Sequence, residues 1–482
     1  MQNLEKSAIE QGVDVEALMD SAGAGIANAI LRRQPHPGLC AAYLGKGNNA
    51  GDAIVACSLL AGAGWEIWLR CMVEDSDLQT LPKKKIAALN ALRIEKPLAA
   101  LPGIRPKIIL DGLLGLGSRP ELSPKLKALT REINALRLNT GATVYAMDFP
   151  TGLGQDGIDP DTVVADCTVT IAFPKTALLR DDVTNVVGRI VVVDLEELTA
   201  RRPKEAAHGV LTEPAGLRHL SPRRSFDSHK GDYGRVGIVA GSRGFAGASM
   251  LCAEAAARSG AGLITLYVPE EIYECVVARI IPEIMVSPVN SFRSILDARL
   301  DALAIGPGLG SSRRPEILDL ISLFPGPAVV DADGLNALSG ETGRLSNTAG
   351  PRLLTPHPGE MSRLWQTKGK TRVQIISEFT AEYPVALLLK GARTLVGQKG
   401  KPIAYNSSGS PGMATGGSGD VLTGVCGALL ARGLSPYDAG RFGAWLCGRA
   451  GELASESLSE ESMLPSDLFV HFGAASRELY WQ

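Results

Sequence analysis

The strongest constraint on the fold is a regular alternation of short apolar segments with helical segments. In residues 1–200, apolar runs such as LCAAYLG, KIILDG and GATVYAMDF are separated by segments with a helical pattern, such as GDAIVACSLLAGAG. These runs are apolar throughout, as expected of strands that are covered on both faces. A βαβ pattern of this kind predicts a parallel, doubly wound α/β sheet.

The same alternation begins again in the second half of the chain. Between the two series, around residues 199–230, the composition becomes basic and rich in proline, without a clear period. A chain of 482 residues is long enough for two such units, each with its own core. We therefore expect one domain over residues 1–205, a linker or domain entry over 206–228, and a second α/β domain over 229–482.

Composition and charge exclude several classes of partner. The 49 basic and 51 acidic residues nearly balance and form no basic stripe, so nucleic acid is not an expected partner. No apolar run is long enough to span a membrane, and the first residues have no signal-peptide pattern. Eight scattered cysteines without a C-x-x-C pair favour a reducing compartment, so a cytoplasmic protein is expected. A homo-oligomer is compatible with the sequence.

Most predicted strands of the second half end in unusual polar turns. GPGLG follows residues 302–305, DADGLN follows 328–330, TPHPGE follows 353–354 and KGART follows 385–389. Ligands of open α/β sheets bind beyond the carboxyl ends of the strands, so these turns should meet at one edge. His357 is either a ligand contact or a structural residue. Asp331 and Asp333 are either a metal–water site or turn caps, of which we favour caps.

The segment ATGGSGDVLTG places glycines directly before an apolar helix. Gly416, Gly417 and Gly419 let backbone N–H groups face an anion at a helix N-terminus, where the helix dipole is favourable. Asp420 at the start of this helix could take a proton from a substrate hydroxyl during phosphoryl transfer. The alternative is an ordinary glycine-rich helix start in which Asp420 is the capping residue. The segment is not a Walker A loop.

Taken in order, these motifs resemble the ADP-dependent NAD(P)H-hydrate dehydratase family, over roughly residues 210–480. The matching segments include HKGDYGRVGIVAGSRGFAGASM, AIGPGLG, VVDADGLNAL, LLTPHPGEMSRL, LLLKGART and GMATGGSGDVLTG. The resemblance implies a ribokinase-like fold and Asp420 as general base. It implies that these residues contact the adenine nucleotide: Lys390, Gly391, Ala392, Arg393, Thr394 and Gly419. It implies that these residues contact the hydrated cofactor: Ala248, Gly308, His357 and Asp420.

A second glycine turn, LGKGNNAGDAIVACSLL, lies near the start of the chain. Its glycine spacing is a poor dinucleotide fingerprint, but Asn48, Asn49 and Asp52 add side-chain oxygens. The alternative is local turn chemistry in which Asp52 is the N-cap of the helix. Asp111 and Asp148 lie at the ends of two later predicted strands. Together with the turn at residues 48–52, this would bring side-chain oxygens from three strand ends to one edge of the sheet.

This first half resembles the NAD(P)H-hydrate epimerase family over roughly residues 1–205, with a Rossmann-like fold. The match includes LMDSAGAGIA near the start and TIAFPKTALL late in the domain. The resemblance implies a potassium ion held by Asn49, Asp111 and Thr151, which offer oxygen ligands. It implies Asp148 as the acid or base that acts on the carbinolamine carbon. It implies that these residues line the hydrate site: Asn48, Asn49, Ala50, Gly51, Asp52, Gly115, Leu116, Gly117, Ser118, Arg119, Pro120, Glu121 and Asp148.

The chain departs from the epimerase pattern at several positions. Ala50 and Ala53 stand where this family usually has glycine, and Thr151 replaces a serine but keeps the hydroxyl. The two added methyl groups raise the question of whether the backbone still approaches the ligand.

Together the resemblances imply a bifunctional repair enzyme that acts on the hydrates of NADH and NADPH. One half would interconvert the R and S hydrates, and the other would use ADP and Mg²⁺ to dehydrate the S form, giving AMP and phosphate. Two alternatives stay open. The second half could be a ribokinase-type kinase of a small vitamin-like alcohol, or the first half could be only a binding or assembly module.

Overall fold

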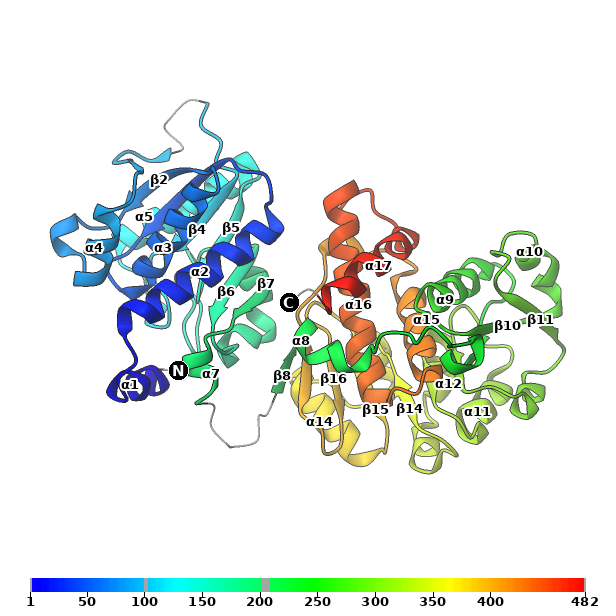
Figure 1. Cartoon of the computed structure of the whole chain (residues 1–482). Helices are drawn as coiled ribbons and strands as arrows, with labels where there is room; N and C mark the ends of the chain where they lie inside the picture. Colours follow the sequence, from blue (N-terminus) through cyan, green and yellow to red (C-terminus); the bar gives the residue numbers. More distant parts are fainter. Residues whose placement is uncertain (1, 99–102, 202–208, 481–482) are drawn as a thin grey trace. The chain divides into compact units, whose positions relative to one another are not determined.

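The computed structural model describes residues 2–98, 103–201 and 209–480 and divides into two compact units (Figure 1). The units are Met1–Glu205 and Ala206–Gln482. Each unit has its own sheet with helices on both faces, so each is described separately.

The first unit is built on a seven-stranded parallel sheet. Its strands are β1 (Leu39–Leu44), β2 (Glu66–Cys71), β3 (Leu92–Arg93), β4 (Ile108–Gly112), β5 (Thr143–Met147), β6 (Cys167–Ile171) and β7 (Arg189–Val193). The strand order is β3-β2-β1-β4-β5-β6-β7. The order reverses between β1 and β4, which pair in parallel, so the carboxyl ends of these strands form a topological switch point. The predicted doubly wound sheet is confirmed.

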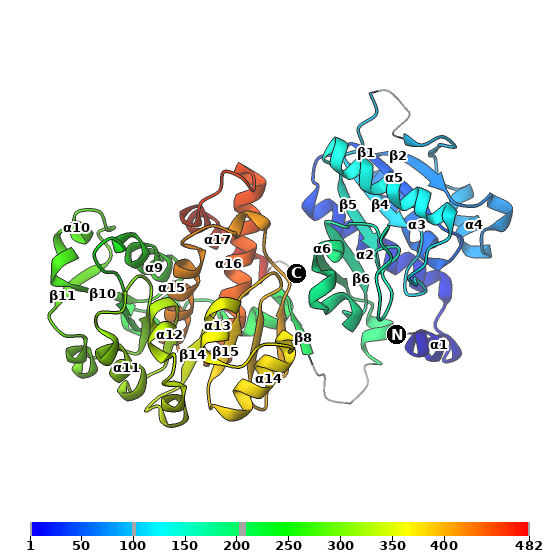
Figure 2. The same ribbon diagram turned by 180° about the vertical axis from the view of Figure 1, so that it is seen from behind.

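Helices cover both faces of this first sheet. They are α1 (Gln2–Glu10), α2 (Val15–Arg33), α3 (Asn48–Gly62), α4 (Thr80–Ala87), α5 (Pro124–Thr140), α6 (Thr184–Val187) and α7 (Glu196–Thr199). Along β1, Cys40 and Ala42 pack with α2 and α3, whereas Ala41 and Tyr43 pack with α5. Figure 1 shows the face with α2 and α3, and Figure 2 shows the face with α5. This two-sided burial explains why the strand segments are apolar at every position.

The second unit contains a ten-stranded mixed sheet. Its strands are β8 (Gly209–Thr212), β9 (Arg235–Val239), β10 (Leu263–Pro269), β11 (Met285–Val289), β12 (Ala302–Ile305), β13 (Ala328–Val330), β14 (Arg352–Leu354), β15 (Ala386–Leu389), β16 (Leu395–Gln398) and β17 (Ile403–Asn406). The order is β11-β10-β9-β12-β13-β14-β15-β16-β17-β8. β16 is antiparallel to β15 and β17. β8 lies within the expected linker or domain entry and pairs with β17, so this part of 206–228 belongs to the second sheet.

Two helical layers enclose the second sheet. The helices are α8 (Pro214–Leu217), α9 (Ala246–Arg258), α10 (Tyr273–Val277), α11 (Arg314–Leu323), α12 (Ala332–Leu338), α13 (Pro358–Leu364), α14 (Arg372–Glu382), α15 (Ser418–Ala431), α16 (Pro436–Leu458) and α17 (Leu468–Glu478). The core on one face contains α9, α15, α16 and α17, and the core on the other contains α11 to α14 (Figures 1 and 2). Gly424 of α15 faces the carbonyl of Cys252 on α9, and an added methyl group there would overlap that carbonyl. None of the helices described in either unit has the length and apolar character that crossing a bilayer requires.

Candidate active sites

The polar turns of the second unit meet at the carboxyl edge of its sheet, as predicted. Asp331 directly follows β13 and is 1% exposed. One of its oxygens accepts a hydrogen bond from Lys390 Nζ at 2.7 Å, and the other accepts one from Thr423 Oγ1 at 2.6 Å. Three elements are therefore joined through one buried carboxylate: the end of β13, the end of β15 and the first turns of α15.

The favoured interpretation of Asp331 as a turn cap is wrong. Asp331 occupies the N-cap position of α12, but its side chain makes no capping hydrogen bond there. Its oxygens are instead directed at Lys390 and Thr423. Asp333 does fasten a turn, because its carboxylate accepts a hydrogen bond from the backbone N–H of Gly310 at 2.7 Å. Thr423, a hydroxyl inside an apolar helix, was missed by the sequence analysis; it lies one helical turn after Gly419.

Asp420 lies in the first turn of α15, in an environment that makes its carboxyl group a base near neutrality. The N-cap of α15 is Gly417, with a φ of 104°, so Asp420 is not the capping residue. Burial, together with the nearby Asp331, raises the pKa of Asp420 to about 7, and Lys390 opposes this rise. A carboxyl group with such a pKa is partly deprotonated at neutral pH and can accept a proton efficiently.

Gly419 lies where the backbone passes close to these charged groups. A methyl group at this position would lie 3.2 Å from Lys390 Nζ and 3.6 Å from Asp331 Oδ2. The start of α15 therefore passes directly beside the ammonium group. An N-terminal helix turn and a lysine at this spacing form an environment suited to an anion.

The predicted nucleotide-binding residues after Lys390 form the tight turn between β15 and β16. Gly391 has a φ of 151° and Arg393 a φ of 56°, both in the region that favours glycine. Thr394 Oγ1 donates to the carbonyl of Gly391 at 3.1 Å. Arg372, which the sequence analysis did not single out, donates to the carbonyls of Ala392 and Arg393 at 3.1 and 3.2 Å. Arg372 thus fixes this turn from the start of α14.

The predicted hydrate-binding residues of the second unit lie on different turns. Gly308 and Ala248 are neighbours, because a methyl group at Gly308 would lie 3.1 Å from Ala248 Cβ. His357 is the N-cap of α13, and its Nδ1 accepts hydrogen bonds from the N–H groups of Gly359 and Glu360. His357 thus caps α13, and its side chain is 53% exposed, so its contact with the hydrate stays a prediction.

In the first unit, the acidic residue at the end of β4 lies beside the loop that follows β5. Thr151 donates twice to the carboxylate of Asp111, through its backbone N–H and its hydroxyl, both at 2.7 Å. Burial raises the pKa of Asp111 to about 6, although these hydrogen bonds oppose the rise. The predicted pair of potassium ligands, Asp111 and Thr151, is therefore in direct contact at the topological switch point.

Asn49 supplies a buried amide group close to this pair of loops. In the part of the chain that the structure describes, its Nδ2 atom has no hydrogen-bond partner. Its Oδ1 atom lies against Gly115, where a methyl group would approach to 2.9 Å. The loop that contains Gly115 is tied to the loop after β5, since Gly152 N–H donates to Ser118 Oγ at 2.9 Å. The predicted hydrate-lining residues 115–121 thus border the loops that bear Thr151 and Asn49.

Asp148 sits in a strained turn and contacts a lysine that the sequence analysis missed. Its φ is 62°, and the N–H of Phe149 donates to the carbonyl of Met147 at 2.7 Å, which closes a three-residue turn. The Asp148 carboxylate accepts hydrogen bonds from Lys175 Nζ and from Thr170 Oγ1. Lys175 is the first charged residue after β6, in the segment TIAFPKTALL. Its position just beyond the end of a strand could have identified it as a candidate site residue.

Two further acids belong to the surroundings of Asp148. The N-cap of α3 is Gly47, so the alternative that Asp52 caps this helix is wrong. Burial raises the pKa of Asp52, and Asp148 and Glu5 add to the rise. Burial and Asp148 also raise the pKa of Glu5 on α1, while Lys175 lowers it. The sequence analysis missed Glu5, because its helix carries no motif.

The extra methyl group of Ala53 faces the sheet. A methyl group added at Gly112 on β4 would lie 2.8 Å from Ala53 Cβ, so this alanine packs between α3 and β4. Ala50 and Ala53 are both fully buried. Ala53 therefore packs between the helix and the sheet, and its methyl group does not point toward the place where the ligand would bind.

Replacing Ala53 by glycine is expected to leave epimerase turnover unchanged and to destabilise the fold by about 1 kcal/mol. The loss follows from the lower helix propensity of glycine. Urea unfolding and an epimerisation assay measure the two effects, with Ala56→Gly on the same buried helix as the matched control. A fivefold gain in epimerase rate for Ala53→Gly alone would contradict this interpretation.

Fold and sites together define a two-domain α/β enzyme, with a Rossmann-like first domain and a ribokinase-like second domain. Residues 236–472 match the family model described as NAD(P)H-hydrate dehydratase, and residues 15–177 match the one described as YjeF-related protein N-terminus. A bifunctional NAD(P)H-hydrate repair enzyme of Moorella thermoacetica is 35% identical, covering 94% of this chain and 90% of the relative. The enzyme of the same description from Coxiella burnetii is 33% identical, covering 98% and 97%. The chain belongs to the family of bifunctional NAD(P)H-hydrate repair enzymes.

A solved structure shows a similar fold for the second unit. A ribokinase-like superfamily protein of Enterococcus faecalis has a TM-score of 0.50 and 26% identity, covering 58% of this chain and 99% of that one. The predicted ribokinase-like fold is thereby confirmed.

Proposed function

We propose that this chain restores hydrated nicotinamide cofactors in two steps. The first unit interconverts the R and S forms of NAD(P)H-hydrate, and the second dehydrates the S form at the expense of ADP, with release of AMP and phosphate. The observation that carries the proposal is the environment of Asp420, a carboxyl group with a pKa of about 7 beside a glycine-bounded helix start and Lys390.

In the second unit, this chain's residues would divide the phosphoryl-transfer step between them. Asp420 accepts the proton of the substrate hydroxyl while the hydroxyl oxygen attacks the terminal phosphorus of ADP. The bond between this phosphorus and the bridging oxygen breaks, and that oxygen leaves with AMP. The N–H groups at the start of α15 and Lys390 stabilise the charge on the transferred group. The ring nitrogen then expels the phosphate, and loss of a neighbouring ring proton restores the dihydropyridine.

Magnesium fits this site as an ion that arrives with the nucleotide. Among the described residues, no group of three or more His, Cys, Asp and Glu side chains is arranged to hold a metal. Both oxygens of Asp331 are already engaged by Lys390 and Thr423. Mg²⁺ commonly takes most of its ligands from substrate phosphates and water, and it would neutralise phosphate charge here.

In the first unit, Asp148 and Lys175 would take the proton of the carbinolamine hydroxyl and supply one to the ring nitrogen as the C–N bond breaks to give an aldehyde. Re-addition of the nitrogen to the other face of the aldehyde, with both proton transfers reversed, gives the opposite configuration. The two side chains contact each other, so a carboxylate and an ammonium group stand ready as base and acid. Asn49, Asp111 and Thr151 would hold potassium. The unpartnered, buried amide of Asn49 fits this role, because rotating the amide by half a turn places its oxygen where the nitrogen now lies.

The dehydratase reaction is expected to speed up as pH rises through about 7. Asp420 must be deprotonated to act as a base, and its pKa in the free enzyme is about 7. Because Lys390 lowers this pKa, Lys390→Met should move the midpoint of kcat/KM to higher pH, besides weakening nucleotide binding. Recovery of dihydronicotinamide absorbance over roughly pH 5.5 to 9 measures the midpoint. Lys401→Met, an exposed lysine of the same unit, is the control, and a midpoint that moves to lower pH or stays in place in Lys390→Met would refute the assignment.

Mixed R and S hydrates of NADH test the proposed function in the full chain. With ADP, all of the dihydronicotinamide absorbance should return; only the S fraction returns promptly if the first unit is a binding or assembly module. Phosphorylation of a vitamin-like alcohol without any recovery would favour the ribokinase-type alternative.

All eight cysteines are free, which supports the cytoplasm as the proposed location.

A further inference from the structure

The second unit contains a cavity of about 330 Å³ that the proposed reaction does not use. Its walls come from the ends of α9, α15 and α17, from α16 and from the segment before β9. The lining residues are Ser221, Pro222, Arg223, Arg224, Arg258, Ser259, Gly260, Leu429, Arg432, Phe442, Leu446, Ser476 and Tyr480. Leu429, Phe442 and Leu446 give it an apolar wall, while four arginines and three serines supply hydrogen-bond donors.

This cavity lies at the opposite end of α15 from the candidate active site. Asp420 is in the first turn of α15, whereas Leu429 and Arg432 are at its last turn and C-cap. A helix of 14 residues is about 20 Å long. The cavity is therefore separate from the residues assigned to nucleotide and hydrate.

Two of the four arginines are held in place by backbone carbonyls. Arg224 donates to the carbonyl of Gly260 at 2.9 Å, and its guanidinium lies 3.7 Å from the centre of the Tyr233 ring. Arg432 donates to the carbonyl of Ser259 at 3.2 Å. These contacts use a part of each guanidinium, which has five N–H donors. The two side chains are thus pre-oriented around the Ser259–Gly260 turn.

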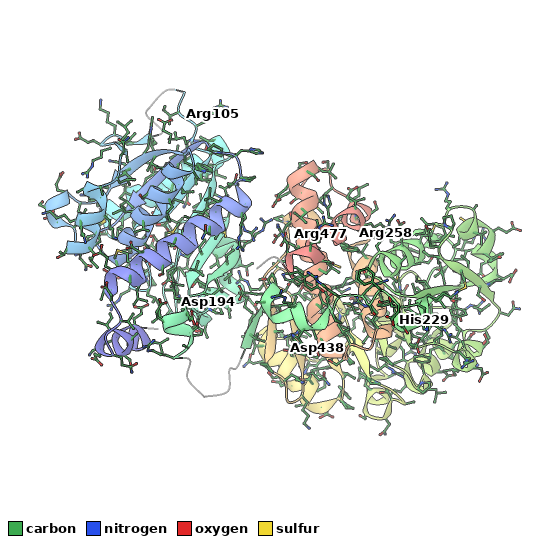
Figure 3. The ribbon with its side chains drawn as sticks, in the orientation of Figure 1. Arg105, Asp194, His229, Arg258, Asp438 and Arg477 are labelled. Carbon is green, nitrogen blue, oxygen red and sulfur yellow. The ribbon has the colours of Figure 1, made fainter. Side chains whose placement is uncertain are left out.

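The other two arginines border the same space. The guanidinium of Arg223 lies 5.6 Å from the ring of Tyr480, which also lines the cavity. Arg258, labelled in Figure 3, is the last residue of α9 and lies 3.7 Å from Glu254, one turn earlier on that helix. None of the described lining residues is an aspartate or a glutamate.

Gathering these cations has an electrostatic cost. Burial and the neighbouring Arg224 both lower the pKa of Arg432, so these two positive charges disfavour each other. Arginine near a helix C-terminus is favourable in itself, and this effect, with the ion pair of Arg258 to Glu254, is the alternative explanation for Arg258 and Arg432. It does not explain why Arg223 and Arg224, on a segment before the sheet, converge on the same concave space. A bound anion would offset the repulsion between Arg224 and Arg432 and give Arg223 and Arg258 a common partner.

We propose that this cavity binds the phosphate groups of a small phosphorylated molecule. Arginine forks match phosphate oxygens in pairs, and the apolar wall would receive the organic part of the ligand. The volume lies within the range of small-molecule sites.

Inorganic pyrophosphate, titrated calorimetrically into the full chain, tests the site. The double variant Arg223→Gln/Arg258→Gln removes two exposed guanidinium groups and keeps Arg224 and Arg432, which donate to the carbonyls of Gly260 and Ser259. It should weaken pyrophosphate binding at least tenfold. Arg279→Gln, an exposed arginine on another part of the unit, should bind as the unmodified chain does. Ser476→Glu places a carboxylate in the cavity without removing an arginine, and it should also abolish binding.

The active site offers a competing location for pyrophosphate, so Lys390→Met is titrated alongside. Binding that is lost in Lys390→Met and retained in the cavity variants would overturn the proposal. Absence of any pyrophosphate binding by the folded, unmodified chain would overturn it too. A thermal melt of each variant verifies that the chain is folded.

Discussion

Asp420→Asn is expected to lower dehydratase turnover by about 10²- to 10⁴-fold, the range that a positioned general base contributes. The substitution keeps the size of the side chain but removes its capacity to accept the substrate proton. The raised pKa of Asp420, about 7, results from burial and from Asp331, so the carboxyl group is tuned for this exchange. ADP-dependent recovery of dihydronicotinamide absorbance from pure S hydrate measures the loss.

Two controls accompany this variant. Epimerisation by the same variant should proceed at the unmodified rate, because Asp148 and Asp111 belong to the other compact unit. Asp438→Asn, a half-buried acid in the first turn of α16, should leave dehydration intact. Dehydration by folded Asp420→Asn at the unmodified pace would remove the basis of the proposed mechanism.

Asp148→Asn is expected to lower epimerase turnover by about 10²- to 10³-fold and to leave dehydration of the S hydrate unchanged. Asparagine retains an oxygen acceptor for Thr170 Oγ1, but it removes the charge that faces Lys175. The turn at φ 62° tolerates asparagine, which adopts the left-handed region more readily than most residues. Conversion of R hydrate to S hydrate, followed in the Asp420→Asn background to stop further reaction, measures the effect.

Lys175→Met separates a catalytic role of this contact from a structural one. If the lysine takes part in proton transfer, its removal lowers kcat and shifts the pH profile of epimerisation. A loss of thermal stability with an unchanged rate would limit Lys175 to holding the strained turn.

The fold could be predicted from the sequence because its main determinants are local. Strands such as Ala328–Val330 and Ala386–Leu389 are apolar at every position, and polar glycine turns follow them, which indicates parallel strands and the functional edge together. The same rule predicts that the KGART turn, which contains Lys390, meets the turns that follow the neighbouring strands. β8 was not predicted, since four residues in a basic, proline-rich segment give no periodicity.

The missed side chains depend on contacts between distant parts of the chain. Thr423 is a polar residue in an apolar helix, and only the packing of α15 on the sheet aims its hydroxyl at Asp331. Lys175 and Asp148 are far apart in sequence and meet because β5 and β6 are neighbours. The capping role of His357 follows from where α13 begins, a boundary that sequence patterns locate poorly.

The measurement that tests the central claim most directly is the stoichiometry of repair by the full chain. Pure S hydrate of NADH is supplied with ADP, and restored NADH, AMP and phosphate are quantified over the same interval. Transfer of the terminal phosphoryl group of ADP to the cofactor hydroxyl predicts one AMP and one phosphate for each NADH that is restored. Restoration of NADH without consumption of ADP, or consumption of ADP without restoration, would contradict it.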